Sequence, residues 1–512
     1  MRLAEVVRTS RAVAETPARS KKIELLAACL AQMDEDELPV GIAFLSGELA
    51  QGKIGVGYAA VRRLAQEPGT TPELTLRDVD RAFDDIVRIG GTGSSARRSE
   101  ALGALFRRAT ADEQHFLARL IVGELRQGAL EGILQEAVAR ATCVPAASLR
   151  RASMLAGDLR RVAQVARAEG EQGLTRFRIE LFRPVSPMLA QPADDVSDVL
   201  EGKDRVALEY KLDGARIQVH RHGDDVRIFT RNLNDVTDRL PEVVERVRRM
   251  PVRELVLDGE AIALGPSGRP QPFQRTMRRF GRELEVPLLQ RELPVTPFFF
   301  DVLHAGGEDL IDRSEEERFA ALSGFVDPDV RIVRAVVSDA DAARAFVEEA
   351  LHRGHEGVIG KALDAPYEAG RRGAAWLKLK QTHTLDLVVL AAEWGSGRRR
   401  GWLSNLHLGA RDPTTSAFVM LGKTFKGLTD AMLRLQTERL LSLETARDDF
   451  TVFVRPELVV EIAFDGVQAS PQYPAGLALR FARVKRYRAD KTAAQADTID
   501  LVRAIYDRSR GG

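Results

Sequence analysis

The chain of 512 residues is too long for one hydrophobic core, so we expect roughly two to four domains. Its hydrophobic content of 44% indicates that these domains are folded and globular. With 75 Lys and Arg against 74 Asp and Glu residues, the formal net charge of +1 excludes a simple polycationic coat protein for nucleic acid. Any DNA-binding face must therefore come from local segregation of charge.

The number of cysteines and the first residues of the chain indicate in which cellular compartment the protein works. Two cysteines, Cys29 and Cys143, are too few for a four-cysteine zinc site or a disulfide framework. The stretch from Met1 to Val6 lacks the apolar core of a secretion signal, and the sequence has no uninterrupted apolar run of membrane-spanning length. We expect a soluble, monomeric protein in the reducing cytoplasm, associated with the nucleoid if it is bacterial.

The first third of the chain has helical periodicity. From Met1 to about Gly173, apolar residues recur three or four positions apart, as in Leu117, Leu120 and Leu125, and strand-like alternation is scarce. This pattern predicts an all-α domain.

A loop within this region combines small residues with basic ones. Gly90-Gly-Thr-Gly-Ser-Ser95 is followed by Arg97 and Arg98, so free backbone N–H groups and two guanidinium groups could hold DNA phosphates. An interhelical turn capped by Ser94 or Ser95 explains the same residues equally well.

Between Arg176 and Gln191, paired prolines indicate an extended connector. From about Asp204 to Thr384, the patterns of strands and helices mix, and no internal repeat or low-complexity tract appears. We predict an all-α domain at 1–178, an α+β domain at 179–384 and a third domain at 385–512.

The stretch 206–220 contains the candidate nucleophile. Apolar and polar residues alternate along 206–211, so a strand would present Glu209 and Lys211 to a common pocket. Asp213-Gly214 is typical of a turn, and the strand that follows brings Arg216 back beside Lys211. Taken alone, Lys-x-Asp-Gly is also what an ordinary surface hairpin contains.

Several downstream strands end in polar or aromatic residues. Any single one fits an ordinary strand terminus, but together they predict a site for a nucleotide. Alternation places Trp376, Lys378 and Lys380 on one face of their strand. The candidate residues are Arg216, Arg231, Lys361, Lys378 and Lys380 as phosphate partners, Glu260 and Glu356 as ligands of a metal or ribose, and one aromatic ring of 298–300 to stack on a base.

The sequence pattern of the third region predicts several short strands around one helix. Strands are expected near 386–395, 402–409, 418–422 and 452–464, with a helix at 429–442, which suggests a small Greek-key β-barrel of the oligonucleotide-binding (OB-fold) type. The basic stretch from Arg480 to Lys491 precedes a closing helix, although it could also be a solvated charged strand.

Seven motifs follow one another along the second and third regions: Lys211-x-Asp213-Gly214, Arg231-Asn232, Asp258-Gly259-Glu260, Phe298-Phe-Phe-Asp301, Glu356-Gly357-Val358, Lys378-x-Lys380 and Arg488-x-Asp490-Lys491. Their order resembles that of the covalent nucleotidyltransferases. The helical region contains Gly91-Thr-Gly-Ser-Ser95 and Arg119-Leu-Ile-Val-Gly-Glu-Leu-Arg126. It resembles the DNA-binding domain of three-domain ATP-dependent DNA ligases of archaea and eukaryotes.

This resemblance implies a role for each matching residue. Lys211 would carry AMP, Glu209 would read adenine, and Phe300 would stack on the base. Arg216, Arg231 and Glu260 would line the ATP pocket, and Glu260 would also hold metal together with Glu356. Lys378 and Lys380 would hold the α-phosphate, and Arg372 would contact the nucleotide. Arg488 and Lys491 would cover the pyrophosphate. Arg371 competes with Arg372 for its assignment.

The implied function is an ATP-dependent DNA ligase that seals nicks in duplex DNA during replication, repair or recombination. It would use ATP and Mg²⁺, with Mn²⁺ as an alternative, and the outer domains would wrap the DNA. An RNA ligase or an RNA-capping guanylyltransferase shares the lysine motif, but the helical domain argues against both. An NAD-dependent ligase would need a zinc site, and a DNA clamp without catalysis would not need Lys211, Glu260 and Lys378 in register.

Overall fold

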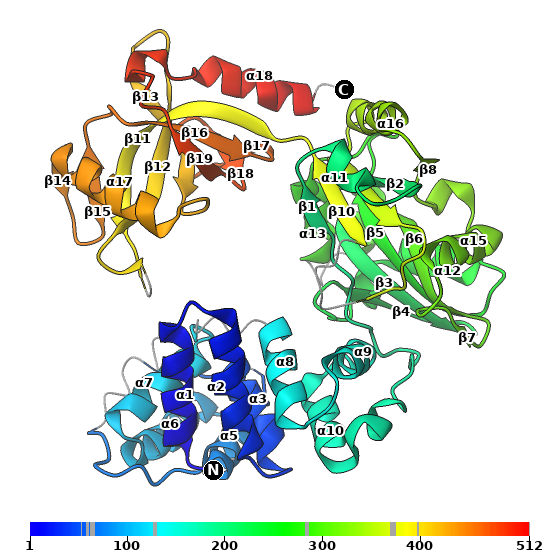
Figure 1. Cartoon of the computed structure of the whole chain (residues 1–512), viewed down its shortest axis with the longest axis vertical. Helices are drawn as coiled ribbons and strands as arrows, with labels where there is room; N and C mark the ends of the chain where they lie inside the picture. Colours follow the sequence, from blue (N-terminus) through cyan, green and yellow to red (C-terminus); the bar gives the residue numbers. More distant parts are fainter. Residues whose placement is uncertain are drawn as a thin grey trace.

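The computed structural model describes residues 1–52, 54–57, 61, 67–125, 131–281, 286–368, 375–396 and 399–510. A helical, a mixed and a strand-rich domain follow one another along the chain and are arranged as an open C (Figure 1). Among these residues, no helix has both the length and the apolar character needed to cross a membrane.

The predicted all-α domain is confirmed, since among the described residues the first strand begins at Gln191. Its helices are α1 (Leu3–Glu15), α2 (Arg19–Ala31), α3 (Glu37–Ser46), α5 (Leu76–Arg88), α6 (Ser94–Arg108), α7 (Ala111–Ile121), α8 (Glu131–Ala141), α9 (Ala146–Ala156) and α10 (Leu159–Leu174). Capping boxes at Thr75 and Thr110 fix the starts of α5 and α7, where each threonine pairs with a carboxylate three residues on. Cys29 is buried, Cys143 is exposed, and both are free thiols.

One of our two interpretations of the glycine-rich loop before α6, that a serine side chain caps it, is wrong. Gly93 is the N-cap residue, with a positive φ of 77°, and no side-chain cap bond forms. Arg97 instead donates to the carbonyl of Gly90 at 2.6 Å, and Arg98 donates to that of Ile89 at 2.6 Å. These two arginines therefore stabilise the loop that they follow.

The connector between the first two domains lies along strand β3 (Ala215–His222). The N–H of Phe182 donates to Nδ1 of His220 at 3.0 Å, and the N–H and carbonyl of Val185 both bind the Gln218 amide. Burial lowers the pKa of His220 to about 3, which keeps its ring neutral and able to accept that bond. The extended connector is thus confirmed, and alternate side chains of β3 fasten it.

The described residues of the middle domain form two five-stranded sheets. One has the order β1-β10-β9-β2-β8 and the other β4-β3-β5-β6-β7. The bounds of the remaining elements are β1 (Gln191–Ala193), α11 (Val196–Leu200), β2 (Val206–Lys211), β4 (Asp225–Thr230), α12 (Pro241–Arg248), β5 (Glu254–Ala263), α13 (Phe273–Phe280), α14 (Val286–Glu292), β6 (Val295–Ala305), β7 (Glu308–Asp309), α15 (Glu315–Phe325), β8 (Arg334–Val337), α16 (Ala340–His352), β9 (Gly357–Ala362) and β10 (Trp376–Lys380).

The Asp213-Gly214 turn joins the two sheets rather than two strands of one hairpin. Strand β2 pairs with β8 and β9, whereas β3 pairs with β4 and β5. A Cβ atom on Gly214 would lie 2.3 Å from Cγ2 of Ile262 and 2.6 Å from the carbonyl oxygen of Ala261, so only glycine fits where the chain crosses over. The surface-hairpin interpretation of this motif is therefore wrong.

The third domain is strand-rich with one internal helix, as predicted. Its strands are β11 (His383–Trp394), β12 (Leu403–Arg411), β13 (Phe418–Thr424), β14 (Glu444–Arg447), β15 (Thr451–Val454), β16 (Val459–Phe464), β17 (Gly466–Ala469), β18 (Leu477–Arg480) and β19 (Arg483–Tyr487), and its helices are α17 (Asp430–Ser442) and α18 (Ile499–Arg510). The order β13-β12-β11-β15-β14 is extended by β16 and β19, and among the described strands this ladder does not close.

Candidate active site

Three neighbouring strands bring Lys211, Glu356 and Lys380 together at one end of their sheet. Lys211 is the last residue of β2, Lys380 is the last of β10, and both lie opposite Gly357 at the start of β9. Oε2 of Glu356 lies 2.5 Å from Nζ of Lys211 and 2.9 Å from Nζ of Lys380. Burial favours the protonated carboxyl, but the two ammonium groups outweigh it and lower the pKa of Glu356.

The backbone geometry at residue 357 explains why glycine follows Glu356. Its φ is +142°, and a Cβ atom would lie 2.1 Å from the carbonyl oxygen of Leu379. Only glycine lets β9 and β10 approach this closely next to Glu356.

Two more carboxylates lie close to Lys211. Glu260 is opposite Arg216 in the pairing of β3 with β5, and burial raises the pKa of Glu260 to about 7 although Lys211 and Arg216 oppose the rise. Burial also raises the pKa of Asp213, against the opposing effect of Arg480. The site therefore combines a lysine with carboxylates that gain protons easily, a common feature of reactive centres.

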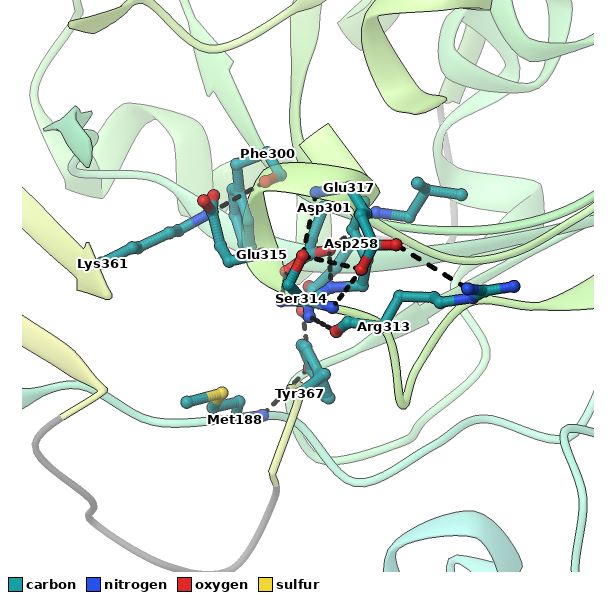
Figure 2. A network of polar contacts seen from close by, with 12 residues as sticks. Met188, Asp258, Phe300, Asp301, Arg313, Ser314, Glu315, Glu317, Lys361 and Tyr367 are labelled. Carbon is teal, nitrogen blue, oxygen red and sulfur yellow. Dashed lines mark hydrogen bonds and ion pairs between the residues drawn. The ribbon is translucent and has the colours of Figure 1, made fainter. Parts of the chain in front are cut away.

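Arg216 is held by a buried polar network that the sequence did not reveal. Its guanidinium donates to both oxygens of Asp258 at 3.0 and 2.5 Å, to the carbonyl of Met188 at 2.5 Å and to the hydroxyl of Tyr367 at 3.1 Å. Tyr367 in turn donates to Asp258 at 2.7 Å and accepts from the N–H of Met188 at 2.9 Å (Figure 2). The predicted pocket residue Arg216 thus also fixes the connector to the middle domain.

An aromatic wall stands beside this network. The rings of Phe300 and Trp376 meet edge to face with centroids 6.0 Å apart, and the Arg216 guanidinium lies 5.4 Å from the Phe300 centroid. Phe300 is half-buried, whereas Phe299 is fully buried in the core, so the predicted alternation of the three phenylalanines is confirmed. A partly accessible aromatic face is available for a planar base.

Lys361 does not fit the phosphate-binding role that the sequence suggested. Its side chain is only 1% exposed, and its ammonium lies 2.7 Å from Oε2 of Glu209 and 2.9 Å from the carbonyl oxygen of Phe300. The alternation pattern identified a charged residue but could not show that a buried carboxylate already binds it.

The other predicted residues take up different positions. Lys378 shares a face of β10 with Lys380, and Arg231 is exposed directly after the end of β4. Arg372 and its neighbour Arg371 lie outside the described residues. Arg488 and Lys491 both bind Asp386 within the third domain, at 2.7 and 2.5 Å, so neither contacts the Lys211 site in this structure.

The third domain contacts the site through residues that the sequence did not single out. Arg480, at the end of β18, binds both oxygens of Asp213 at 2.7 and 3.2 Å. Asp465, between β16 and β17, accepts from Lys380 at 3.3 Å. Arg480 lay within the basic stretch noted above, but no local pattern identifies a partner 267 positions away.

The structure has a lysine at a junction of two sheets, surrounded by carboxylates and lysines and followed by a strand-rich domain, which is the arrangement that the resemblance to nucleotidyltransferases led us to expect. Three family models match: "DNA ligase N terminus" at 56–139, "ATP dependent DNA ligase domain" at 187–380 and "ATP dependent DNA ligase C terminal region" at 399–491. The chain belongs to the ATP-dependent DNA ligase family, whose general function is to seal nicks in DNA.

Relatives of similar length support this assignment. The chain is 60% identical to a probable DNA ligase of Anaeromyxobacter sp. (strain K), over 99% of this chain and 100% of that protein. It is 55% identical to a probable DNA ligase of Sorangium cellulosum (strain So ce56), over 100% of this chain and 96% of that protein. The solved structure titled Pmar-Lig_PreS3 shares the fold, with a TM-score of 0.61 and 19% identity over 94% of this chain and 99% of its own.

Proposed function

We propose that this ligase carries AMP on Lys211, and the convergence of Lys211, Glu356 and Lys380 on one point is the observation that supports it most. The nitrogen of a neutral Lys211 attacks the α-phosphorus of ATP. A phosphorus–nitrogen bond forms, the bond to the bridging oxygen breaks, and pyrophosphate leaves. The Lys211 ammonium, which lies 2.5 Å from Glu356, must lose a proton before this attack.

AMP then passes from Lys211 to the 5′-phosphate at the nick, which restores the free lysine. The adjoining 3′-hydroxyl attacks that phosphate, the phosphodiester bond forms, and AMP leaves. These steps need alignment and charge neutralisation more than further covalent chemistry. Lys378 and Lys380 hold the α-phosphate, and Arg231 and Arg372 contact the nucleotide.

The base lies between the aromatic wall and Glu209. Phe300 stacks on it, and Glu209, on the same face of β2 as Lys211, accepts a hydrogen bond from its amino group. Glu260 lines the ribose side. Arg216 supports the pocket through Asp258 and Tyr367, because its donors are already engaged there.

Glu260 and Glu356 would hold Mg²⁺, or Mn²⁺ in its place. No group of three metal-binding side chains occurs among the described residues, but Mg²⁺ commonly uses one or two carboxylates together with the phosphates of its substrate. The oxygen donors present fit that requirement. When bound, the metal would neutralise phosphate charge during the transfer.

The third domain is proposed to be an OB-fold that turns between steps, in a monomer that acts on nicked duplex DNA in the cytoplasm. The contacts of Arg480 and Lys380 across the domain boundary support one orientation, in which Arg488 and Lys491 lie on Asp386. The other orientation would bring Arg488 and Lys491 over pyrophosphate, whose charge would compete with Asp386 for them.

Replacing Arg488 or Lys491 by alanine should slow reaction with ATP more than sealing of a nick that already carries AMP. Their proposed partner, pyrophosphate, exists only in the first step. We expect a difference of about ten- to a hundredfold, since a hydrogen bond to a charged group contributes roughly 1.5–3 kcal/mol. Single-turnover assays of the two steps measure it.

Arg486→Ala is the matched control, because Arg486 is an exposed neighbour that binds Glu461. It should leave both steps unchanged. Equal losses in the two steps for Arg488→Ala and Lys491→Ala would assign these residues to DNA binding or to folding instead.

The proposed function is tested by incubating the protein with Mg²⁺ and labelled ATP, GTP or NAD. A covalent, acid-labile adduct formed from ATP alone is the expected result. An adduct from GTP would favour an RNA-capping enzyme, and sealing of nicked RNA in preference to nicked DNA would favour an RNA ligase.

A further inference from the structure

Glu209 lies between two basic side chains, one from each neighbouring strand. Its Oε1 is 3.3 Å from Nη1 of Arg334, its direct cross-strand partner on β8. Its Oε2 is 2.7 Å from Nζ of Lys361 on β9. The side chains of Glu209, Arg334 and Lys361 are 3%, 8% and 1% exposed, so water does not weaken these ion pairs.

Glu315 covers this group from the start of α15. Its Oε2 accepts from Nη2 of Arg334 at 2.9 Å, its Oε1 contacts Nη1 of the same residue, and it lies 3.9 Å from Nζ of Lys361. The helix N-terminus, capped by Ser314, favours a negative charge at Glu315. Two carboxylates and two cations therefore form a buried cluster with no net charge, as burial requires.

The cluster touches the aromatic wall of the nucleotide pocket. The Lys361 ammonium lies 5.0 Å from the Phe300 centroid and 4.6 Å from that of Trp376. It also donates to the Phe300 carbonyl (Figure 2). Lys361 therefore links the Glu209 carboxylate to the residue whose ring is proposed to stack on the base. Arg334 and Lys361 each occupy one of its oxygens, and each oxygen can accept a further N–H.

The protonation state of Glu209 decides which base it can bind. An ionised carboxylate only accepts hydrogen bonds, which suits the 6-amino group of adenine and repels the 6-oxo group of guanine or hypoxanthine. A protonated carboxyl can donate to that oxygen. Burial raises the pKa of Glu209, Lys361 and Arg334 oppose the rise, and Glu315 reinforces it.

We propose that Lys361 and Arg334 are positioning residues that set the base preference of this site by keeping Glu209 an acceptor that selects a 6-aminopurine nucleotide over a 6-oxopurine one, and that Glu315 acts in the opposite direction. The inference rests on the proposed function, in which Glu209 reads the base. None of the three residues touches the nucleotide. They act through the charge and orientation of Glu209.

The test compares ATP with inosine triphosphate, which has oxygen in place of the 6-amino group. We expect the full-length wild-type protein to form its covalent adduct with ATP at a kcat/KM on the order of 100-fold or more above that with inosine triphosphate. Lys361→Met keeps the length of the side chain but removes its charge. This preference should then fall by about tenfold or more, with the larger loss at lower pH.

Glu315→Gln provides the opposite change in charge at nearly constant shape. It removes the negative group that favours protonation of Glu209, so the preference for ATP should stay the same or rise. A purely structural defect would move both variants in the same direction. If Lys361→Met does not fold, Arg334→Met removes the other positive charge beside Glu209 and should lower the preference in the same way.

The inference is overturned if Lys361→Met, or Arg334→Met in its place, labels with ATP and retains the wild-type preference. It is also overturned if Glu315→Gln loses the preference together with Lys361→Met. A wild-type protein that labels with neither nucleotide would overturn the proposed function, and this inference with it. Labelling of the wild type with ATP, together with an unchanged preference in the variants, would refute the inference alone.

Discussion

Replacing Lys211 by alanine is expected to abolish reaction with ATP and the sealing of nicks that depends on it. The covalent adduct needs an amine at this point, and removal of a nucleophile typically costs a factor on the order of 10⁴ or more. The fold should survive, since Glu356 keeps its ion pair with Lys380 at 2.9 Å. The free energy of unfolding should change by no more than about 1 kcal/mol, the range of a partly exposed ion pair.

Two further variants test whether Lys211 acts through its amine or only through its positive charge. Lys211→Arg retains a positive charge beside Glu356 but cannot become neutral, so it should be inactive as well. Lys203→Ala is the control: in the described part of the chain, this lysine of the same domain donates to the carbonyls of Val199 and Glu201, and its loss should leave activity intact. If Lys211→Ala still acquires label from ATP, another residue carries the nucleotide.

Removing the helical domain is expected to leave reaction with ATP within a few-fold of normal and to slow nick sealing by about a hundredfold, through the loss of phosphate contacts. The truncated chain should begin at Arg176, because Phe182, Val185 and Met188 of the connector bind β3 and must be kept. Binding to nicked duplex, measured at several salt concentrations, should be weaker and less salt-dependent than in the full chain.

Thermal unfolding of the truncated protein must be checked first, because one hydrophobic core continues from the helices through Val185 and Met188 to Tyr367 and Trp376. A folded truncation that seals nicks at the full rate would show that the helical domain has another role. It would also strengthen the RNA-ligase and capping interpretations.

Local sequence patterns predicted the features that depend only on neighbouring residues. Helical spacing identified the first domain, and strand alternation placed Glu209 and Lys211 on one face of β2, with Leu208 and Tyr210 in the core behind. Alternation also put Lys378 and Lys380 on one face of β10. These predictions succeeded because side-chain direction follows from the backbone period alone.

Features that depend on distant partners could not be predicted. Alternation does not say which strands pair, so the crossing of the chain between sheets at Gly214 was hidden. Arg216 and Tyr367 are 151 positions apart, and nothing near either one indicates their contact. Lys361 was assigned to phosphate because the pattern gives its charge but not its burial beside Glu209.

The central claim, that Lys211 carries AMP from ATP to the nick, is tested most directly by a pulse and chase. The protein is labelled with ATP that carries ³²P in the α-phosphate, freed of nucleotide, and mixed with nicked duplex DNA and Mg²⁺. The label should be found on Lys211 by peptide mapping, then on the 5′-phosphate of the nick, and finally in free AMP as the strand is sealed. Label on another residue, or sealing while the label stays on the protein, would contradict the account.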